Sequence, residues 1–415
     1  MDRQRKGKSR VRKIYLTILV SLMIGGTGIN MMYLSGCGKD TSEKAETAKP
    51  ENGQKEENKS ETGKQKSRTE EDEKYYYQQL GEQEQKAYTE LLDGIQDMDT
   101  KIRVDLTGQK ELEKMNEAMV YDMPQLFWYS GSWRAEMYSD YTEIYPEYTC
   151  DAETRVERQK EIAETAEKCL QNMKNCNGEY EKIKYVFEYL VNTVEYDPSA
   201  TDNQNLYSAL IGKHSVCAGY AKAAQYLLEK SGIECIYVTG TTNRGEAHAW
   251  NIVKCNGKYY HFDATWGDPL YQEQEDTEQT GQEVNRINYD YLCCDDESIR
   301  KDHTIGSFAE YPVCDSDDLN YFKLNNMYYE SYDAAALLEK MKESYEKKED
   351  SFTCEFSNPD VYAQAREDII NNLLPQASQG LAQYYGFNQV AYSYTEYTEH
   401  YRMAVYWQYA EYTGN

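Results

Sequence analysis

The hydrophobic and polar positions in the middle of the chain predict one helix followed by a run of strands. Small and apolar residues recur at helical spacing from Ala218 to Leu228. Ser215 is of a type that caps helix N-termini, and Ser231-Gly232 is a typical stop signal. This pattern places Cys217 at the second position of the predicted helix.

Beyond Gly232 the pattern becomes that of β-strands. Three strands are predicted, over Ile233 to Thr239, Ala247 to Cys255 and Lys258 to Trp266. Asn256-Gly257 separates the last two, and this dipeptide is the strongest short-range signal of a two-residue hairpin.

A two-residue loop fixes the register of this hairpin. Trp250 then lies opposite Asp263, and His248 lies opposite Thr265. Because paired residues share a face, His248 and Asp263 become diagonal neighbours with Cα atoms about 7–8 Å apart. A three-residue loop would move Asp263 to the other face, so this prediction depends on an even-numbered loop.

Cys217, His248 and Asp263 are the candidate chemical residues. At the start of a helix, unpaired N–H groups and the positive end of the helix dipole favour a thiolate, the nucleophilic form of cysteine. A thiolate, a histidine and an orienting carboxylate form the general arrangement for acyl transfer.

These residues resemble the transglutaminase-like superfamily, the branch of papain-type cysteine enzymes whose chain order is Cys, His, Asp. The matching segments are VCAGYA at Val216 to Ala221, HAWN at His248 to Asn251 and DATWGDP at Asp263 to Pro269, with spacings of 31 and 15 residues between the three candidates. The resemblance covers about 90 residues from Tyr180 to Pro269 and is weaker in the following YLCCDDESIRKDH segment. It implies that Cys217 is the nucleophile, His248 the general base and acid, and Asp263 the group that fixes the histidine tautomer.

Other interpretations of these residues stay open at this point. A lone Cys217 would more often be a core residue than a nucleophile. His214 is a rival base, although it lies on a predicted loop with no carboxylate strand behind it. Papain-type enzymes commonly place a glutamine oxyanion donor about six residues before the cysteine, where this chain has Ile211. The backbone N–H of Cys217 could supply one donor, and the second has no candidate.

Two tryptophans and a cluster of cysteines and acidic residues are further candidates for a site. Trp250 and Trp266 are expected to pack in the core, although Trp250 shares the face of His248 and could wall a substrate groove. Cys293-Cys294-Asp295-Asp296, with His303 and Cys314 downstream, suggests a metal site. The spacing matches no standard zinc pattern and neighbouring strand residues face opposite ways, so we expect no metal. Thiolate chemistry also requires no coenzyme.

The fold class predicted is α+β, with helices packed on an antiparallel sheet in a core at residues 179–315 and smaller α+β lobes at 75–178 and 316–415. The expected helices are within Tyr75 to Met98 and at Glu111 to Tyr121, Asp151 to Met173, Glu179 to Asn192, Asp333 to Glu346 and from Asp360 onward with an interruption near Pro375. The other expected strands are Lys101 to Val104, Ala135 to Tyr138, Ile144 to Tyr148, Asn288 to Cys294, Phe352 to Phe356, Val390 to Tyr394 and Met403 to Trp407.

The N-terminus predicts export and tethering. Residues 1–13 carry seven Lys or Arg and one Asp, and a mostly apolar run follows from Ile14 to Leu34. The run ends in Leu34-Ser35-Gly36-Cys37, which resembles a bacterial lipoprotein signal and implies a signal peptide at 1–36, a lipid on Cys37 and a place on the outer face of the plasma membrane. The alternative is an uncleaved transmembrane helix of about 20 residues. Residues 37–74 are almost entirely polar, which predicts a disordered stalk.

The net charge of the chain limits the classes of molecule that it can bind. The formal net charge is −27, and it becomes −33 once the signal region, with its seven basic residues and one acidic residue, is left out. Nucleic acid is excluded as a partner because phosphate binding requires a cationic face. A protein or peptide substrate is expected, with a cell-wall peptide as one candidate. Two functions therefore stand: a tethered extracellular cysteine enzyme that forms an acyl-enzyme on Cys217, or a catalytically silent adhesion or wall-binding module.

Overall fold

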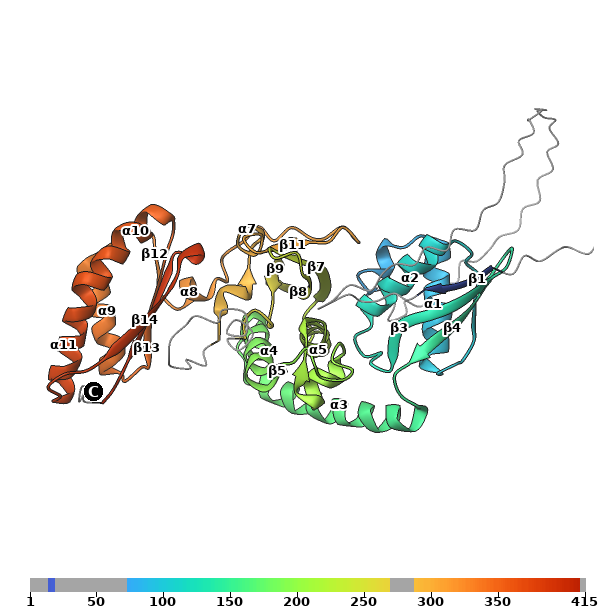
Figure 1. Ribbon diagram of the computed structural model, residues 1–415, viewed down its shortest axis with the longest axis horizontal. Coiled ribbons are helices and arrows are strands. Elements are labelled where there is room, and N and C mark those ends of the chain that lie inside the picture. Colours follow the sequence, from blue (N-terminus) through green and yellow to red (C-terminus); the bar gives the residue numbers. More distant parts are fainter. Residues whose placement is uncertain (1–13, 19–72, 269–286, 411–415) are drawn as a thin grey trace, which may run out of the picture.

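The structure is a computed structural model that describes residues 14–18, 73–268 and 287–410. Its helices and strands form three parts that follow one another along the longest axis of the molecule (Figure 1). Each part combines helices with an antiparallel or mixed sheet, which confirms the predicted α+β class. The predicted domain boundaries stay a prediction.

The first part is a four-stranded antiparallel sheet in the order β1-β3-β4-β2, with two helices and a short 3-10 helix. Its elements are β1 (Ile14–Ile18), η2 (Tyr77–Gln79), α1 (Glu82–Gln96), β2 (Ile102–Val104), α2 (Gln109–Asp122), β3 (Tyr129–Met137) and β4 (Thr142–Tyr148). β1 comes from the start of the apolar run that predicted export. The remainder of that run, Cys37 and most of the predicted stalk lie outside the described residues, so lipidation stays a prediction.

The second part contains the helices and the five-stranded sheet that carry the candidate residues. α3 (Ala152–Met173) begins at the N-cap Asp151 and runs from the first part to the second (Figure 1). The other elements are α4 (Glu179–Thr193), β5 (Glu195–Tyr196), the π-helix η3 (Ser208–Gly212), β6 (His214–Ser215), α5 (Cys217–Lys230), β7 (Cys235–Thr242), β8 (Ala247–Cys255), β9 (Lys258–Phe262), η4 (Tyr289–Tyr291), β10 (Leu292–Cys294), α7 (Asp296–Ile299) and β11 (His303–Ile305). The strand order is β10-β9-β8-β7-β11, all antiparallel.

The predicted hairpin register is confirmed from the loop as far as the pair Asn251 and Phe262, whereas the predicted pairs Trp250–Asp263 and His248–Thr265 are not formed because β9 ends at Phe262. β8 and β9 pair Cys255 with Lys258 and Ile252 with His261, as a two-residue loop requires. Asn256 and Gly257 both have positive φ values, 51° and 82°, which is the conformation that a type I′ turn needs.

Two local predictions are wrong. β9 ends at Phe262 instead of Trp266, because the Asp263 carboxylate accepts the backbone N–H groups of Thr265 and Trp266 and turns the chain. Ser215 is not the cap of α5. Its hydroxyl is hydrogen-bonded to Ser208 Oγ and the Asn203 carbonyl. The helix begins one residue later than predicted, with Val216 as N-cap and Cys217 as the first helical residue.

The third part is a mixed four-stranded sheet in the order β12-β13-β15-β14, covered by helices. Its elements are α8 (Tyr321–Leu324), β12 (Tyr328–Tyr329), α9 (Ala334–Glu346), β13 (Ser351–Phe356), α10 (Pro359–Asp368), the π-helix η5 (Ile369–Leu373), α11 (Leu374–Tyr385), β14 (Tyr392–Tyr397), η6 (Thr398–His400) and β15 (Arg402–Trp407). A buried ion pair between Arg402 and Asp290 joins it to the second part. The predicted interruption near Pro375 is observed as η5.

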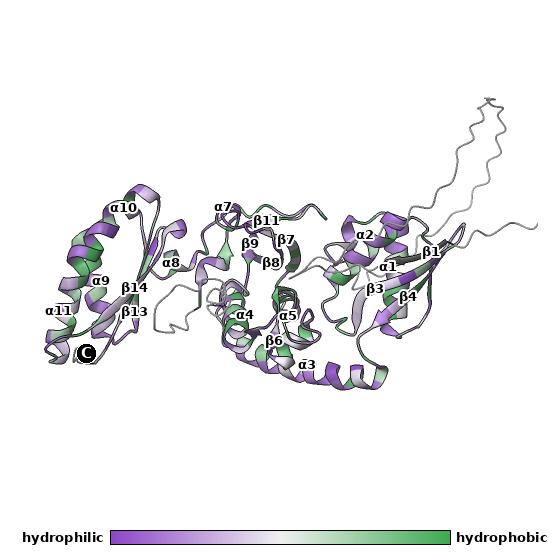
Figure 2. Cartoon of the chain, viewed as in Figure 1, coloured by the Kyte–Doolittle hydropathy of each residue, from purple (hydrophilic) through white to green (hydrophobic). Residues whose placement is uncertain are grey.

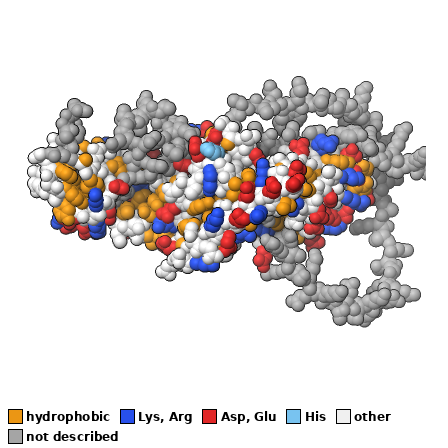
Figure 3. All heavy atoms as spheres, turned by 90° about the horizontal axis from the view of Figure 1, so that it is seen from below, with side chains coloured by type: hydrophobic (Ala, Val, Ile, Leu, Met, Phe, Trp, Pro, Cys, Tyr) orange, Lys and Arg blue, Asp and Glu red, His pale blue; other side chains and the backbone are white. Residues whose placement is uncertain are grey.

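The hydrophobic cores of the three parts show which of the parts pack together. Buried apolar side chains of the first and second parts form one continuous cluster, whereas the third part has a cluster of its own. Figure 2 shows apolar residues on α5 and the central strands, and mainly polar residues on the outer side of α3. Within the residues described, no helix is both long and apolar enough to cross a membrane. On the face in Figure 3, acidic and basic side chains are intermixed over the described residues.

Candidate active site

Cys217 is held in place by contacts on both sides of the first turn of α5. Gly219 allows the preceding segment to approach closely, since a Cβ there would lie 1.9 Å from Ser215 Oγ. Tyr220 donates its hydroxyl to Asp268, just beyond Asp263, at 2.9 Å. The Asn251 amide of β8 donates to the Ala221 carbonyl at 3.1 Å. These bonds lock the start of the helix against the strand that carries His248.

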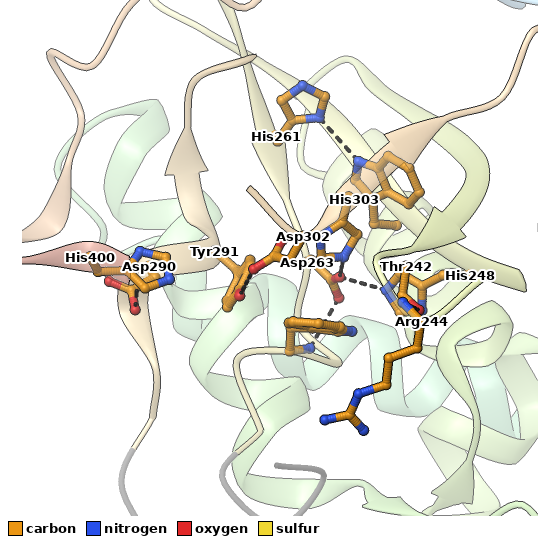
Figure 4. A network of polar contacts seen from close by, with 12 residues as sticks. Thr242, Arg244, His248, His261, Asp263, Asp290, Tyr291, Asp302, His303 and His400 are labelled. Atoms are coloured by element: carbon orange, nitrogen blue, oxygen red, sulfur yellow. Dashed lines mark hydrogen bonds and ion pairs between the residues drawn. The ribbon is translucent and has the colours of Figure 1, made fainter. Parts of the chain in front are cut away.

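His248 and Asp263 are joined by a direct hydrogen bond (Figure 4). His248 Nε2 lies 2.6 Å from Asp263 Oδ2, and both side chains are almost fully buried, with exposed fractions of 3% and 1%. The other carboxylate oxygen, Oδ1, accepts the backbone N–H of Thr265 at 2.9 Å and that of Trp266 at 3.2 Å. The turn that ends β9 therefore also fixes the orientation of the carboxylate.

Cys217 completes the group, because it is one of the two residues that raise the pKa of the His248 imidazole. Nε2 of His248 is bonded to Asp263, which leaves Nδ1 for the sulfur. Burial alone would lower the pKa of His248, but Asp263 and Cys217 outweigh it and raise that pKa to about 10. Burial alone would raise the pKa of Asp263, but the neighbouring imidazoles of His248 and His303 hold it well below its usual range. The structure thus brings together the three residues that the sequence singled out.

These shifts predict a pH-dependent stability. A pKa of His248 that rises from about 6.5 in the unfolded chain to about 10 contributes stability fully below about pH 6.5 and loses it as the pH rises toward 10. We expect urea unfolding, followed by tryptophan fluorescence, to show a loss of about 3 kcal/mol between about pH 6.5 and 9.5 from this residue. His248→Gln should show a smaller loss over that range. A variant as steeply pH-dependent as the wild type would contradict the assignment.

His303 is a member of this cluster that the sequence predictions missed. Its Nε2 lies 3.1 Å from Asp263 Oδ2, the same oxygen that His248 contacts, and its Nδ1 is bonded to Asp302. It reaches the site because β11 pairs with β7, placing His303 beside Thr242 at the edge of the sheet. The only local signal in the sequence is a histidine after an aspartate, and this histidine belongs to the group that suggests a metal site.

The other residues considered from the sequence lie apart from this group. His214 is on the short strand β6, with its Nδ1 3.6 Å from Glu195 and 3.7 Å from Asp197 at the surface, so the prediction that no carboxylate stands near it is wrong. Ile211 is in the π-helix η3 and offers no side-chain donor. Trp250 is fully buried and stacks on His248 at a centroid distance of 5.9 Å, which makes it a packing residue.

Two groups of potential metal ligands occur among the described residues, His248-Asp263-His303 and His261-Asp296-Cys314. In the second group, His261 accepts a hydrogen bond from Trp250 at Nδ1 and contacts Asp296 through Nε2. In the first, both nitrogens of His303 face carboxylates. Of the set considered from the sequence, Asp296 and Cys314 lie together beside His261, whereas His303 contacts Asp263 and Asp295 caps α7.

A cysteine at a helix N-terminus, facing a histidine and an aspartate from an antiparallel sheet, defines the papain-like class of cysteine-enzyme folds. Residues 165–264 match the family model of the transglutaminase-like superfamily, so the chain contains a transglutaminase-like domain. The matched range ends one residue after Asp263 and includes all three candidate residues.

Individual relatives cover only part of the chain. It is 25% identical over 114 residues to the kyphoscoliosis peptidases of Mus musculus and Homo sapiens, which is 24% of this chain and 17% of each relative. The chain therefore spans about a sixth of the length of these curated relatives. Among solved structures it is similar to a TGase, with a TM-score of 0.25, 14% identity and coverage of 40% of this chain and 50% of the other.

Proposed function

We propose that this protein is a cysteine enzyme of the transglutaminase-like type that forms a thioester on Cys217 from a peptide or glutamine carboxamide. The observation that carries the proposal is the connected set Cys217, His248 and Asp263, buried together and fixed by hydrogen bonds. A charged imidazole and carboxylate so deeply buried are stable only as partners of one another.

The chemistry follows from these contacts. The sulfur of Cys217, its proton held by His248, attacks the carbonyl carbon; a C–S bond forms and the carbonyl oxygen takes the negative charge. The backbone N–H of Cys217, unpaired at the first helical position, is one donor for that oxygen. When the intermediate collapses, the C–N bond breaks and the leaving amine takes the proton from His248. An acceptor then loses a proton to His248 and attacks the carbonyl carbon of the thioester. The C–S bond breaks, the acyl group leaves on the acceptor, and the proton on His248 returns to the sulfur.

The acceptor can be water, which makes the enzyme a protease or deamidase, or an amine, which makes it a cross-linking transferase. Hydrolysis is the first to test because the curated relatives are named peptidases. The test compares wild type with Cys217→Ala on casein, on glutamine donors with a labelled amine, and on cell-wall peptides. It records new termini, released ammonia and incorporated label separately.

A second function has one observation in its favour, namely the burial of the thiol. Cys217 is only 1% exposed. Tyr237, which is electrostatically coupled to it, packs on Tyr121 of α2 at 5.1 Å, and Tyr121 packs on Phe308 at 5.2 Å. In a silent adhesion or wall-binding module the thiol would stay buried. In an enzyme it must become accessible to substrate, so alkylation of Cys217 by iodoacetamide near neutral pH discriminates the two.

We further propose that the protein acts outside the cell, tethered by a lipid on Cys37. The support is the sequence of residues 1–37 alone. Replacing Cys37 with alanine is expected to abolish lipid labelling and release the protein from the membrane fraction. If the variant stays in membranes without a lipid, an uncleaved apolar span is the anchor instead.

A further inference from the structure

His303 extends the hydrogen-bonded chain beyond the three residues considered so far (Figure 4). Its side chain is fully buried and reaches Asp263 Oδ2 with Nε2 at 3.1 Å. On its other side, Nδ1 is bonded to Asp302 Oδ1, and Tyr291 donates its hydroxyl to Asp302 Oδ2 at 2.5 Å. Asp302 is thus anchored on one oxygen and directed at His303 with the other.

The geometry determines the charge of this second imidazole. A carboxylate oxygen accepts hydrogen bonds, so each nitrogen of His303 must carry a hydrogen to bond its carboxylate. An imidazole with hydrogen on both nitrogens is the charged imidazolium. Burial by itself lowers the pKa of His303, but Asp263 and Asp302 outweigh it and raise that pKa.

The resulting arrangement alternates in charge: Asp302 is negative, His303 positive, Asp263 negative and His248 positive. The centroids of the His303 and His248 rings are 5.1 Å apart, and both rings lie on the same carboxylate oxygen. The aromatic rings of Trp250, Trp266 and Tyr291 pack around His303 at 5.2, 4.6 and 5.8 Å and keep the surroundings apolar. Screening by water is weak in such surroundings, so the repulsion between the two imidazolium rings is strong.

We propose that His303, held as an imidazolium by Asp302, is a positioning residue that fixes Asp263 and keeps the proton on His248 ready for transfer. The inference rests on the proposed function for its purpose, although its geometry stands alone. When Asp263 interacts with two imidazolium groups, it stabilises the charged form of His248 less than it would if His248 were its only partner. A histidine that must pass a proton to a leaving amine works best when its pKa is not too far above the working pH.

Among the described residues, four titratable groups surround the imidazoles of His248 and His303. They are Asp263 after β9, Asp302 before β11, Tyr291 in η4 and Cys217 at the start of α5. His261, the next imidazole on the sheet, is bonded to Trp250 and Asp296 instead, and burial lowers its pKa.

The test is a pH titration of ring nitrogens by NMR on full-length protein labelled with ¹⁵N-histidine. The chain has five histidines, so each signal can be assigned by single substitution. At neutral pH, His303 should show two protonated nitrogens. In His303→Asn, the titration midpoint of His248 should move up by about one pH unit, because a positive charge about 5 Å away is lost. Asp302→Asn, which preserves the shape of the site, should shift the His248 midpoint in the same direction by less.

His261→Asn is the matched control, since it removes a neighbouring buried imidazole that does not touch Asp263. It should leave the His248 midpoint unchanged. A neutral His303 at pH 7 would overturn the inference. So would a titration midpoint of His248 that is the same in wild type, His303→Asn and Asp302→Asn, or one that moves by the same amount in His261→Asn. The readout needs no substrate, so failure to find turnover would count against the proposed function only.

Discussion

Replacing Cys217 with alanine is expected to remove all turnover of whichever substrate the wild type processes, by a factor of about 10⁴ or more. The methyl group cannot form the thioester, and His248 then has no thiol from which to take a proton. The measurement is the initial rate with casein, amine donors and wall peptides, together with mass spectrometry of the intact protein for an acyl adduct. Only wild type should gain the mass of the acyl group.

Cys255→Ala is the matched control for this variant. Cys255 is a fully buried cysteine at the end of β8, the strand that also carries His248, and it makes no contact with Asp263 in the described structure. Its loss should leave turnover near wild type, while thermal unfolding reports the effect of the lost sulfur. Equal activity of wild type and Cys217→Ala would remove the thioester mechanism and favour the silent module.

Much of the central fold could be predicted because its signals are local. Asn256-Gly257 can adopt positive φ at both positions, so the loop length, and with it the pairing of β8 and β9, followed from two residues. The end of β9 could not be predicted in this way. It depends on Asp263 using its own carboxylate to bind the next backbone N–H groups, which alternation of apolar residues does not encode.

In the candidate site, too, the residues with local signals could be predicted and the residue that depends on tertiary packing could not. His248 lies on the hairpin and Asp263 directly follows it, so the approach of these two residues could be derived from the hairpin register. The place of Cys217 beside them was implied by the family resemblance. His303 lies 40 residues beyond Asp263 and reaches it only because β11 joins the far edge of the sheet, beside β7. Pairing of an edge strand across such a separation depends on tertiary packing, and a three-residue strand gives almost no periodic signal.

Replacing Asp263 with asparagine is expected to lower turnover by about 10³–10⁴-fold while the side chain keeps its shape. The carboxylate accepts from backbone N–H groups on Oδ1 and from two imidazoles on Oδ2. An amide has only one oxygen, and the two backbone donors of the turn favour placing it at Oδ1. The NH₂ group then points at His248, so Nε2 must accept and the ring hydrogen moves to Nδ1. That nitrogen faces Cys217 and can no longer take its proton.

The prediction separates a tautomer effect from a loss of folding. Asp263→Asn should bind substrate with KM close to wild type and lose kcat, and ¹⁵N-histidine spectra should show the hydrogen of His248 on Nδ1. Asp268→Asn is the control, because Asp268 is an equally buried carboxylate close to Asp263 that accepts the hydroxyl of Tyr220, and an amide oxygen can still accept that hydrogen bond. If both variants lost activity equally, or if Asp263→Asn kept wild-type kcat, then Asp263 would be a structural carboxylate, and the orientation of His248 would have to come from the packing of Trp250 and Trp266 around it.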